Sequence, residues 1–178
     1  MYISAPMSDK LEIDTKKLID SIFNNSVENE DETLKVMKRE INLLFDKHRR
    51  VYSNMIDEIS SSKLGISAVM EDTIKKVFSD GSINWGRIVS LITFGVLVAD
   101  YLKTNDGEHE IVAVKDSISS YLINHQKEWL LKNNAWKGFV DFFQVTSNLP
   151  SIKSSLTVFI ALISFGAVLY SFFNLTTF

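Results

Sequence analysis

The chain has 178 residues and a formal net charge of -3, with 46% hydrophobic and 23% charged residues. That length suits one packed domain with a short appendage better than two domains. The slightly acidic balance gives no electrostatic reason to expect a nucleic-acid partner. The chain contains no cysteine, which excludes disulfides, thiolate chemistry and cysteine-bound zinc.

The first half of the chain predicts three helices. Proline occurs only at Pro6 and Pro150, and no alternating β-branched run appears, so the whole fold is predicted to be all-α. A first helix is expected from Ser8, as N-cap, to about residue 24, followed by a loop over 25–31. Apolar residues then recur at steps of three and four over 34–55, which indicates an amphipathic helix. The serines at 60–62 interrupt this pattern, and Gly65 is expected to be a helix C-cap before a short helix over 69–78.

The segment Ile83–Leu102 is the most apolar internal stretch and allows two interpretations. Its length is that of a membrane span. However, Asn84, Arg87, Ser90, Thr93 and Asp100 recur along it, which favours a helix buried on nearly all sides at the centre of a bundle. Further helices are predicted over 111–125, 129–131 and 136–143.

The C-terminal tail contains about 18 residues without a charge, Leu156–Phe173. As a helix this segment would be roughly 27 Å long, just enough to cross the core of a bilayer. We therefore predict a helical domain over 1–150 and a transmembrane tail anchor over 151–178. The alternative is a hydrophobic helix that folds back into the bundle or its groove.

Two motifs make the sequence specific. The first is the run 77–95, Val-Phe-Ser-Asp-Gly-Ser-Ile-Asn-Trp-Gly-Arg-Ile-Val-Ser-Leu-Ile-Thr-Phe-Gly, and the second is Trp129–Lys132 followed by Trp136–Phe143. They resemble the first and second homology motifs of the Bcl-2 family, above all the branch named for myeloid cell leukaemia. This resemblance implies a helical bundle with a central, mostly buried hydrophobic hairpin and a surface groove.

The first motif also makes physical sense. Asn84 can cap the new helix through its side chain, and Gly86 removes a side chain where another helix must approach closely. Arg87 lies in the first turn, where the helix macrodipole disfavours a cation, so another use is indicated. The resemblance implies that Arg87 pairs with an aspartate on a visiting partner helix.

The resemblance further implies a groove that receives the apolar anchors of an amphipathic helix. The predicted partner-binding set is Arg87, Asn84, Gly86, Asp80, Tyr52, Met55, Ile74, Val77, Leu91 and Phe94. The large aromatic residues Trp129, Trp136 and Phe143 are assigned to packing instead.

The third homology motif of the family departs from its pattern. Counted back from Asn84 it falls at Met37, Ile41 and Asn42, where a bulky residue replaces the small one and an amide replaces the acid. A register shifted to Phe45 and Asp46 recovers the acid but places phenylalanine at the small position. The chain therefore looks built to receive such helices rather than to offer one.

These features predict an anti-apoptotic regulator that sequesters the death-motif helices of Bax-like, Bak-like and Bim-like relatives, with a heterodimer as the product. The alternative is a pro-apoptotic member that permeabilises membranes through its central hairpin. The expected location is the cytosolic face of the mitochondrial outer membrane, with the endoplasmic reticulum as a second candidate. The sequence indicates no enzyme, no cofactor and no metal site, because the three histidines are scattered and no phosphate-binding loop occurs.

Overall fold

The computed structural model of the chain describes residues 7–25, 30–61 and 64–147. Within these ranges the secondary structure is entirely helical, which confirms the predicted all-α class. The helices are α1 (Met7–Phe23), α2 (Glu32–Ser61), α3 (Ile66–Val77), α4 (Trp85–Thr104), the 3-10 turn η1 (Glu108–Glu110), α5 (Ile111–His125), α6 (Lys127–Lys132) and α7 (Ala135–Ser147). The uncharged segment 156–173 and the predicted boundary after residue 150 lie outside the described residues.

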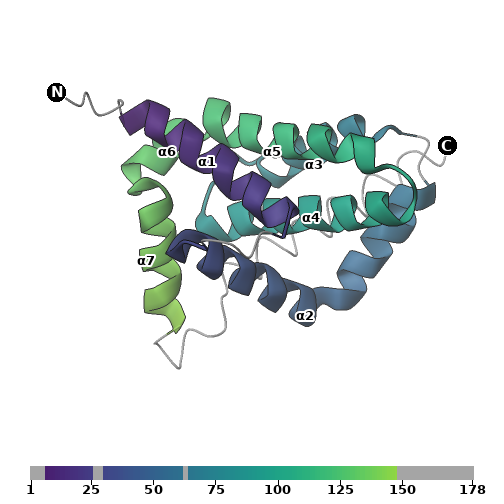
Figure 1. The fold of residues 1–178 in the computed structure, drawn as a ribbon, viewed down its shortest axis with the longest axis horizontal. Helices are drawn as coiled ribbons and strands as arrows, with labels where there is room; N and C mark the ends of the chain where they lie inside the picture. Colours follow the sequence, from purple (N-terminus) through teal and green to yellow (C-terminus); the bar gives the residue numbers. More distant parts are fainter. Residues whose placement is uncertain (1–6, 26–29, 62–63, 148–178) are drawn as a thin grey trace.

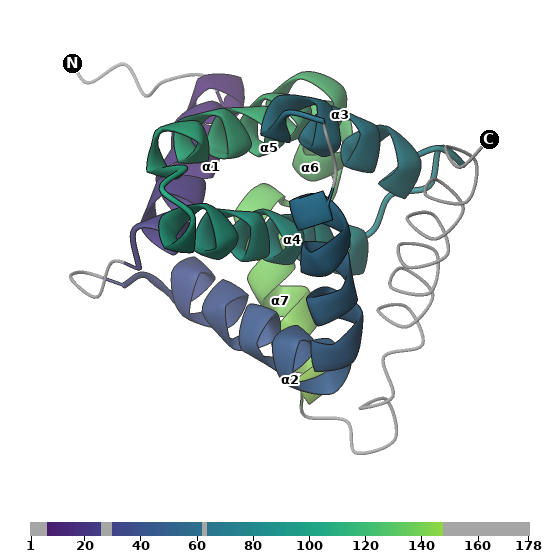
Figure 2. The same cartoon turned by 90° about the vertical axis from the view of Figure 1, so that its right-hand side faces the viewer.

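Helix α4 lies at the centre of the bundle. It packs against α2 on one side and against α5 and α1 on the other, while α3 lies against α4 and α5. Figure 1 shows α1 and α5 above α4, α2 below it, and α7 crossing the end of the bundle; Figure 2 shows the same layers from the side. This arrangement leaves α4 covered by neighbours from several directions.

The burial of α4 decides between the two interpretations of the apolar segment. Among the described helices, α4 alone is long and apolar enough to cross a membrane, yet 78% of its most apolar window is buried inside the protein. Its buried hydroxyls are satisfied within the helix, because Ser90 donates to the Gly86 carbonyl at 2.9 Å and Thr93 to the Val89 carbonyl at 2.8 Å. In this structure α4 is therefore the core helix of a bundle, as predicted.

Gly95 allows three helices to approach closely at the middle of α4. A Cβ atom at this position would lie 2.4 Å from Ile118 Cδ1 of α5 and 3.0 Å from Phe23 Cζ of α1. Both distances are shorter than ordinary van der Waals contact, so a side chain at this position would force the ends of the Ile118 and Phe23 side chains to shift within the core.

Two predicted helix boundaries were wrong. Gly65 is not a C-cap but stands at the N-cap of α3, with extended backbone angles (φ -66°, ψ 153°). Helix α2 ends at Ser61, within the serines that interrupt its apolar pattern, but it bends at His48, whose φ of -124° and ψ of 25° are not helical. The first helix begins at Met7, so Ser8 lies inside it. Periodicity predicted these helices, but their ends depend on local backbone geometry.

The closing aromatic residues pack as predicted. Trp129 lies edge-on to Trp85, with ring centroids 4.7 Å apart. Trp136 is 5% exposed and its indole nitrogen donates to Thr15 Oγ1 of α1 at 2.9 Å. These contacts fix α6 and α7 across the start of α4 and the side of α1.

Candidate functional site

The loop from α3 to α4 is a tight turn held by its own side chains. Gly81 has a φ of 70°, in the left-handed region that favours glycine. Asp80 Oδ1 accepts from the Ser82 backbone N–H at 2.9 Å, and Asn84 Oδ1 accepts from the Arg87 backbone N–H at the same distance. The predicted capping role of Asn84 is confirmed, and the cap starts α4 in the orientation that positions Arg87.

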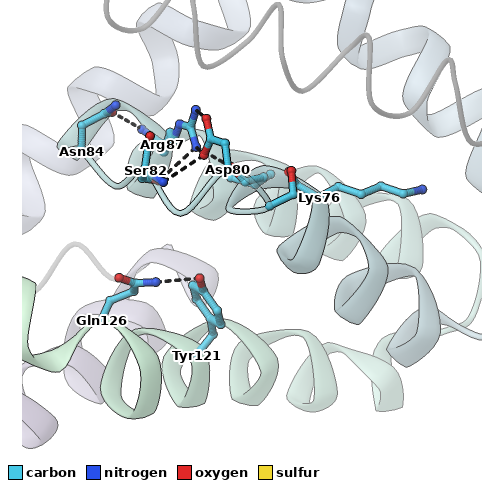
Figure 3. Close-up of polar contacts among 9 residues, drawn as sticks. Lys76, Asp80, Ser82, Asn84, Arg87, Tyr121 and Gln126 are labelled. Carbon is cyan, nitrogen blue, oxygen red and sulfur yellow. Dashed lines mark hydrogen bonds and ion pairs between the residues drawn. The ribbon is translucent and has the colours of Figure 1, made fainter.

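The Arg87 guanidinium is bound from several directions by this loop (Figure 3). Nη1 donates to the Val77 carbonyl at 2.9 Å, to the Ser82 carbonyl at 3.0 Å and to Asp80 Oδ1 at 2.5 Å. Nη2 donates to Asp80 Oδ2 at 2.7 Å. Asp80 thus binds the end of the guanidinium with both carboxylate oxygens, a bidentate geometry that arginine favours.

Burial and charge differ between the two members of this pair. Arg87 is only 6% exposed, whereas the Asp80 side chain is 55% exposed. The hydrogen bonds from Arg87, and next the one from the Ser82 backbone, hold the pKa of Asp80 well below its usual range. Asp80 is therefore ionised at neutral pH. Because half of the carboxylate faces water, solvent screens much of the attraction.

The predicted apolar set converges on α4 from two neighbouring helices. Leu91 and Phe94 of α4 are fully buried. The remaining members are also buried, none more than 7% exposed: Ile74 and Val77 from α3, Tyr52 and Met55 from α2. Gly86 is buried in the first turn of α4. All six side chains belong to one hydrophobic core, so a helix could reach them only after the side chains that cover them move.

Helices α2 and α3 stand as two walls over α4. Among the described residues the two hardly touch each other, since α2 packs mainly on α4 and α3 mainly on α5. Figure 2 shows the second half of α2 and α3 on either side of the α4 axis. These are the elements from which a helix-binding groove would form, but in this structure the apolar side chains between them are packed in the core.

Tyr52 adds a buried hydroxyl to this region. Burial raises the pKa of this phenol, and the nearest polar neighbour is the Thr93 side chain. The two hydroxyls do not reach hydrogen-bond geometry, and within the described part of the chain Tyr52 Oη has no hydrogen-bond partner. The Thr93 hydroxyl instead donates to the Val89 carbonyl at 2.8 Å.

The structure also adds features that sequence reasoning missed. The carbonyls of Val77 and Ser82 bind Arg87, although Val77 was predicted only as an apolar wall. The aspartate-glycine turn was the available signal, but its pairing with Arg87 could not be read from spacing alone.

Two surface pockets lie away from this site. One, of about 470 Å³, is lined by residues of α1, the start of α2 and Trp136; the other, of about 400 Å³, lies between the end of α1, α2 and the end of α4. Neither is lined by a predicted binding residue. Among the residues that the structure describes, no cluster of His, Asp or Glu has the grouping that a metal ion needs.

Sequence comparisons match the part of the chain that contains Arg87 and its loop. The family model described as apoptosis regulator proteins of the Bcl-2 family matches residues 37–136. Bcl-2-like protein 1 of Rattus norvegicus is 26% identical over 99 residues, which cover 54% of this chain and 41% of that protein. Anti-apoptotic protein NR13 of Coturnix japonica is 27% identical over 89 residues, 50% of each chain. The matched segments thus cover half or less of these curated relatives.

Solved structures share the fold over most of the chain. The zebrafish pro-survival protein NRZ in its apo form has a TM-score of 0.69 at 25% identity, covering 78% of this chain and 97% of that one. Its complex with the Bad BH3 segment scores 0.68 at 24% identity, covering 77% and 97%. Trichoplax adhaerens Bcl-2L2 bound to a Bak BH3 segment scores 0.61 at 24% identity, with the same coverage.

Proposed function

This chain belongs to the Bcl-2 family of apoptosis regulators, and from that premise we propose that it is a pro-survival member. In this proposal it captures the amphipathic death-motif helix of a pro-apoptotic relative between α2 and α3, with α4 as the floor. Sequestration of that helix prevents permeabilisation of the mitochondrial outer membrane. The matched relatives include a protein named as anti-apoptotic, which supports a pro-survival role over a pro-apoptotic one.

The observation that carries the proposal is the position of Arg87. It lies in the first turn of α4, at the end of the apolar floor that Leu91 and Phe94 continue along the same helix. Once the side chains that cover this floor move aside, a visiting amphipathic helix with an aspartate beside its apolar stripe would meet both apolar side chains and a guanidinium there. Charge-assisted contacts with arginine are directional, so this cation would fix the register of the visitor.

Solved relatives support the same binding mode. The zebrafish protein and the Trichoplax protein are each seen in complex with a BH3 segment of a pro-apoptotic relative. We extend that mode to this chain as a proposal, with Bax-like, Bak-like and Bim-like helices as the partners and a heterodimer as the product.

The packing of α2 indicates that the chain receives a death-motif helix and does not offer α2 as one. Met37 is fully buried and Ile41 is 5% exposed, so both are packed in the core, while Asn42 is exposed. To act as a donor, this helix would have to withdraw two core residues and would still present an amide where the motif has an acid. The chain is therefore poorly equipped to activate another member of the family.

Two finer points belong to the same proposal. The resemblance of the 77–95 motif suggests partner preferences like those of the myeloid-cell-leukaemia branch. The uncharged segment 156–173 would act as a tail anchor that holds the helical domain on the cytosolic face of the mitochondrial outer membrane or the endoplasmic reticulum.

A binding titration tests the first part. Labelled helices of Bax-like, Bak-like and Bim-like proteins are titrated with the full chain, alongside versions in which the motif aspartate is replaced by asparagine. Arg87→Gln should weaken binding of the aspartate helices by about 1 to 3 kcal/mol. Arg49→Gln is the matched control, because Arg49 is an exposed arginine on α2 whose side chain is 83% accessible. Equal affinities for the wild type and Arg87→Gln would contradict the proposed site.

A vesicle assay separates the pro-survival role from a membrane-permeabilising one. Vesicles loaded with a dye are treated with an activated Bax-like protein, with and without this chain. The proposal expects retention of the dye when this chain is present. Release of the dye by this chain alone would instead assign it to the pro-apoptotic, membrane-permeabilising members of the family.

A further inference from the structure

The carboxylate-binding end of Arg87 is already occupied within the chain. Asp80 takes both Nη1 and Nη2 with its two oxygens, at 2.5 and 2.7 Å. A visiting aspartate would need the same guanidinium, which is 6% exposed and partly covered by Asp80 (Figure 3). Two carboxylates that compete for one cation repel each other, so they do not bind it independently.

We propose that Asp80 is an internal competitor: it occupies Arg87 in the free protein and has to leave when the acid of a visiting helix binds. The inference rests on the proposed function, because it concerns the same groove. It assigns Asp80 the role of a specificity-determining residue that stands in for the partner's aspartate.

The geometry allows Asp80 to leave while Arg87 stays in place. The Val77 and Ser82 carbonyls also accept from Nη1, at 2.9 and 3.0 Å, so both N–H donors of this nitrogen keep an acceptor when the carboxylate leaves. Asp80 itself is half exposed, and the neighbouring Gly81 and Ser82 are exposed as well. Apart from Arg87, its carboxylate accepts hydrogen bonds among the described residues only from backbone N–H groups of the exposed turn, that of Ser82 and its own. The carboxylate can therefore turn into water without removing a core contact.

The exchange would make the site selective rather than merely tight. A helix that carries an acid replaces one carboxylate with another, so Arg87 remains neutralised. A helix without an acid would either leave Asp80 in place or bury Arg87 with an unpaired charge, which costs free energy. Because the free protein is mostly in the occupied state, the apparent affinity is lowered by the fraction of protein in which Arg87 is accessible.

The test is a double-mutant cycle on the full chain. Asp80→Asn keeps a side chain of similar shape and an oxygen acceptor but removes the charge. Binding of a Bim-like helix should tighten by about fivefold to twentyfold. The same helix with asparagine in place of its aspartate should show less than about a twofold change. Asp72→Asn is the matched control, because Asp72 is an acid of the neighbouring α3 that pairs with Lys76 at 2.6 Å instead of Arg87.

The possible results separate this inference from the proposed function. If neither helix binds the wild type, the proposed function fails and so does the inference. If the aspartate helix binds but Asp80→Asn leaves its affinity unchanged or weaker, Asp80 orients or shares Arg87 and the inference is overturned. An equal gain from Asp72→Asn would also overturn it, because general acidity rather than competition would explain the effect.

A second measurement uses the wild-type chain and does not depend on the folding of a variant. The carboxyl carbon resonance of Asp80 is followed by NMR while the Bim-like helix is added. Release from Arg87 should move this resonance towards that of a solvated aspartate, and the asparagine helix should cause no such shift. An Asp80 resonance that stays in place at saturation would show that the pair survives binding, which contradicts the inference.

Discussion

Replacement of Arg87 by methionine should destabilise the fold even in the absence of a partner. Methionine keeps much of the apolar stem but removes the guanidinium. The change leaves the Val77 carbonyl, whose bond with Arg87 is buried, and the Ser82 carbonyl without their donor. It also frees Asp80, which is exposed enough to regain water.

The size of the destabilisation can be worked out from the two carbonyls that lose their donor. Each carbonyl loses a hydrogen bond to a charged donor, and an acceptor left unpaired in the interior costs about 1 to 3 kcal/mol. The loss is partly offset because a buried guanidinium no longer has to be desolvated. The net destabilisation should be about 2 to 4 kcal/mol, a large fraction of the stability of an ordinary domain.

Urea unfolding monitored by circular dichroism measures this change, with equal slopes required for a two-state comparison. Arg49→Met serves as the control. The Arg49 side chain is 83% exposed and its ion pair with the exposed Asp46 is long, at 3.3 Å, so its loss should cost less than about 1 kcal/mol. A stability of Arg87→Met within about 0.5 kcal/mol of the wild type would refute the view that this arginine holds the α3–α4 loop.

Three further outcomes are expected. The pKa of the Asp80 carboxyl in the folded protein lies below its ordinary value of 3.8, so its contribution to stability is present above that pH and is lost as the pH falls through the folded pKa. Below about pH 4, the free energy of unfolding of Asp80→Asn should therefore fall less steeply with decreasing pH than that of the wild type. Gly95→Ala should destabilise the bundle by about 1 to 3 kcal/mol in urea unfolding, because the new methyl group would lie 2.4 Å from Ile118 Cδ1 in a packed core. An unchanged midpoint would mean that the Ile118 side chain turns away without cost. Trp136→Phe should cost about 1 to 3 kcal/mol in the same assay, because it leaves the buried Thr15 hydroxyl without its indole donor, and a double replacement with Thr15→Val should recover part of that loss.

Much of the fold could be predicted from periodicity and caps. The steps of three and four in α2, the apolar run that became α4 and the capping side chain of Asn84 all act locally, and the structure confirms them. The ends of helices were less predictable. The bend at His48 and the extended backbone at Gly65 lie in backbone angles that the spacing of apolar residues does not encode.

The residues of the site could be predicted from the sequence, but the hydrogen bonds between them could not. The motif singled out Asp80, Asn84 and Arg87, and the structure brings all three into one network around the start of α4. That Asp80 binds Arg87 with both oxygens follows from the left-handed turn at Gly81, which directs the loop back towards the helix. Sequence spacing shows that the residues are near each other but not which hydrogen bonds they form.

The burial of the groove residues has a consequence for experiments on this protein. Leu91 and Phe94 are fully buried core residues, so their replacement by alanine would remove stability as well as any binding surface. Arg87 has the same double effect, because it holds two loop carbonyls. Asp80 is the exception, because its side chain is half exposed and its neighbours in the turn are solvated. Substitution at this position can therefore change recognition of an acid with the least disturbance of the core, which makes Asp80 the best place to separate binding from folding.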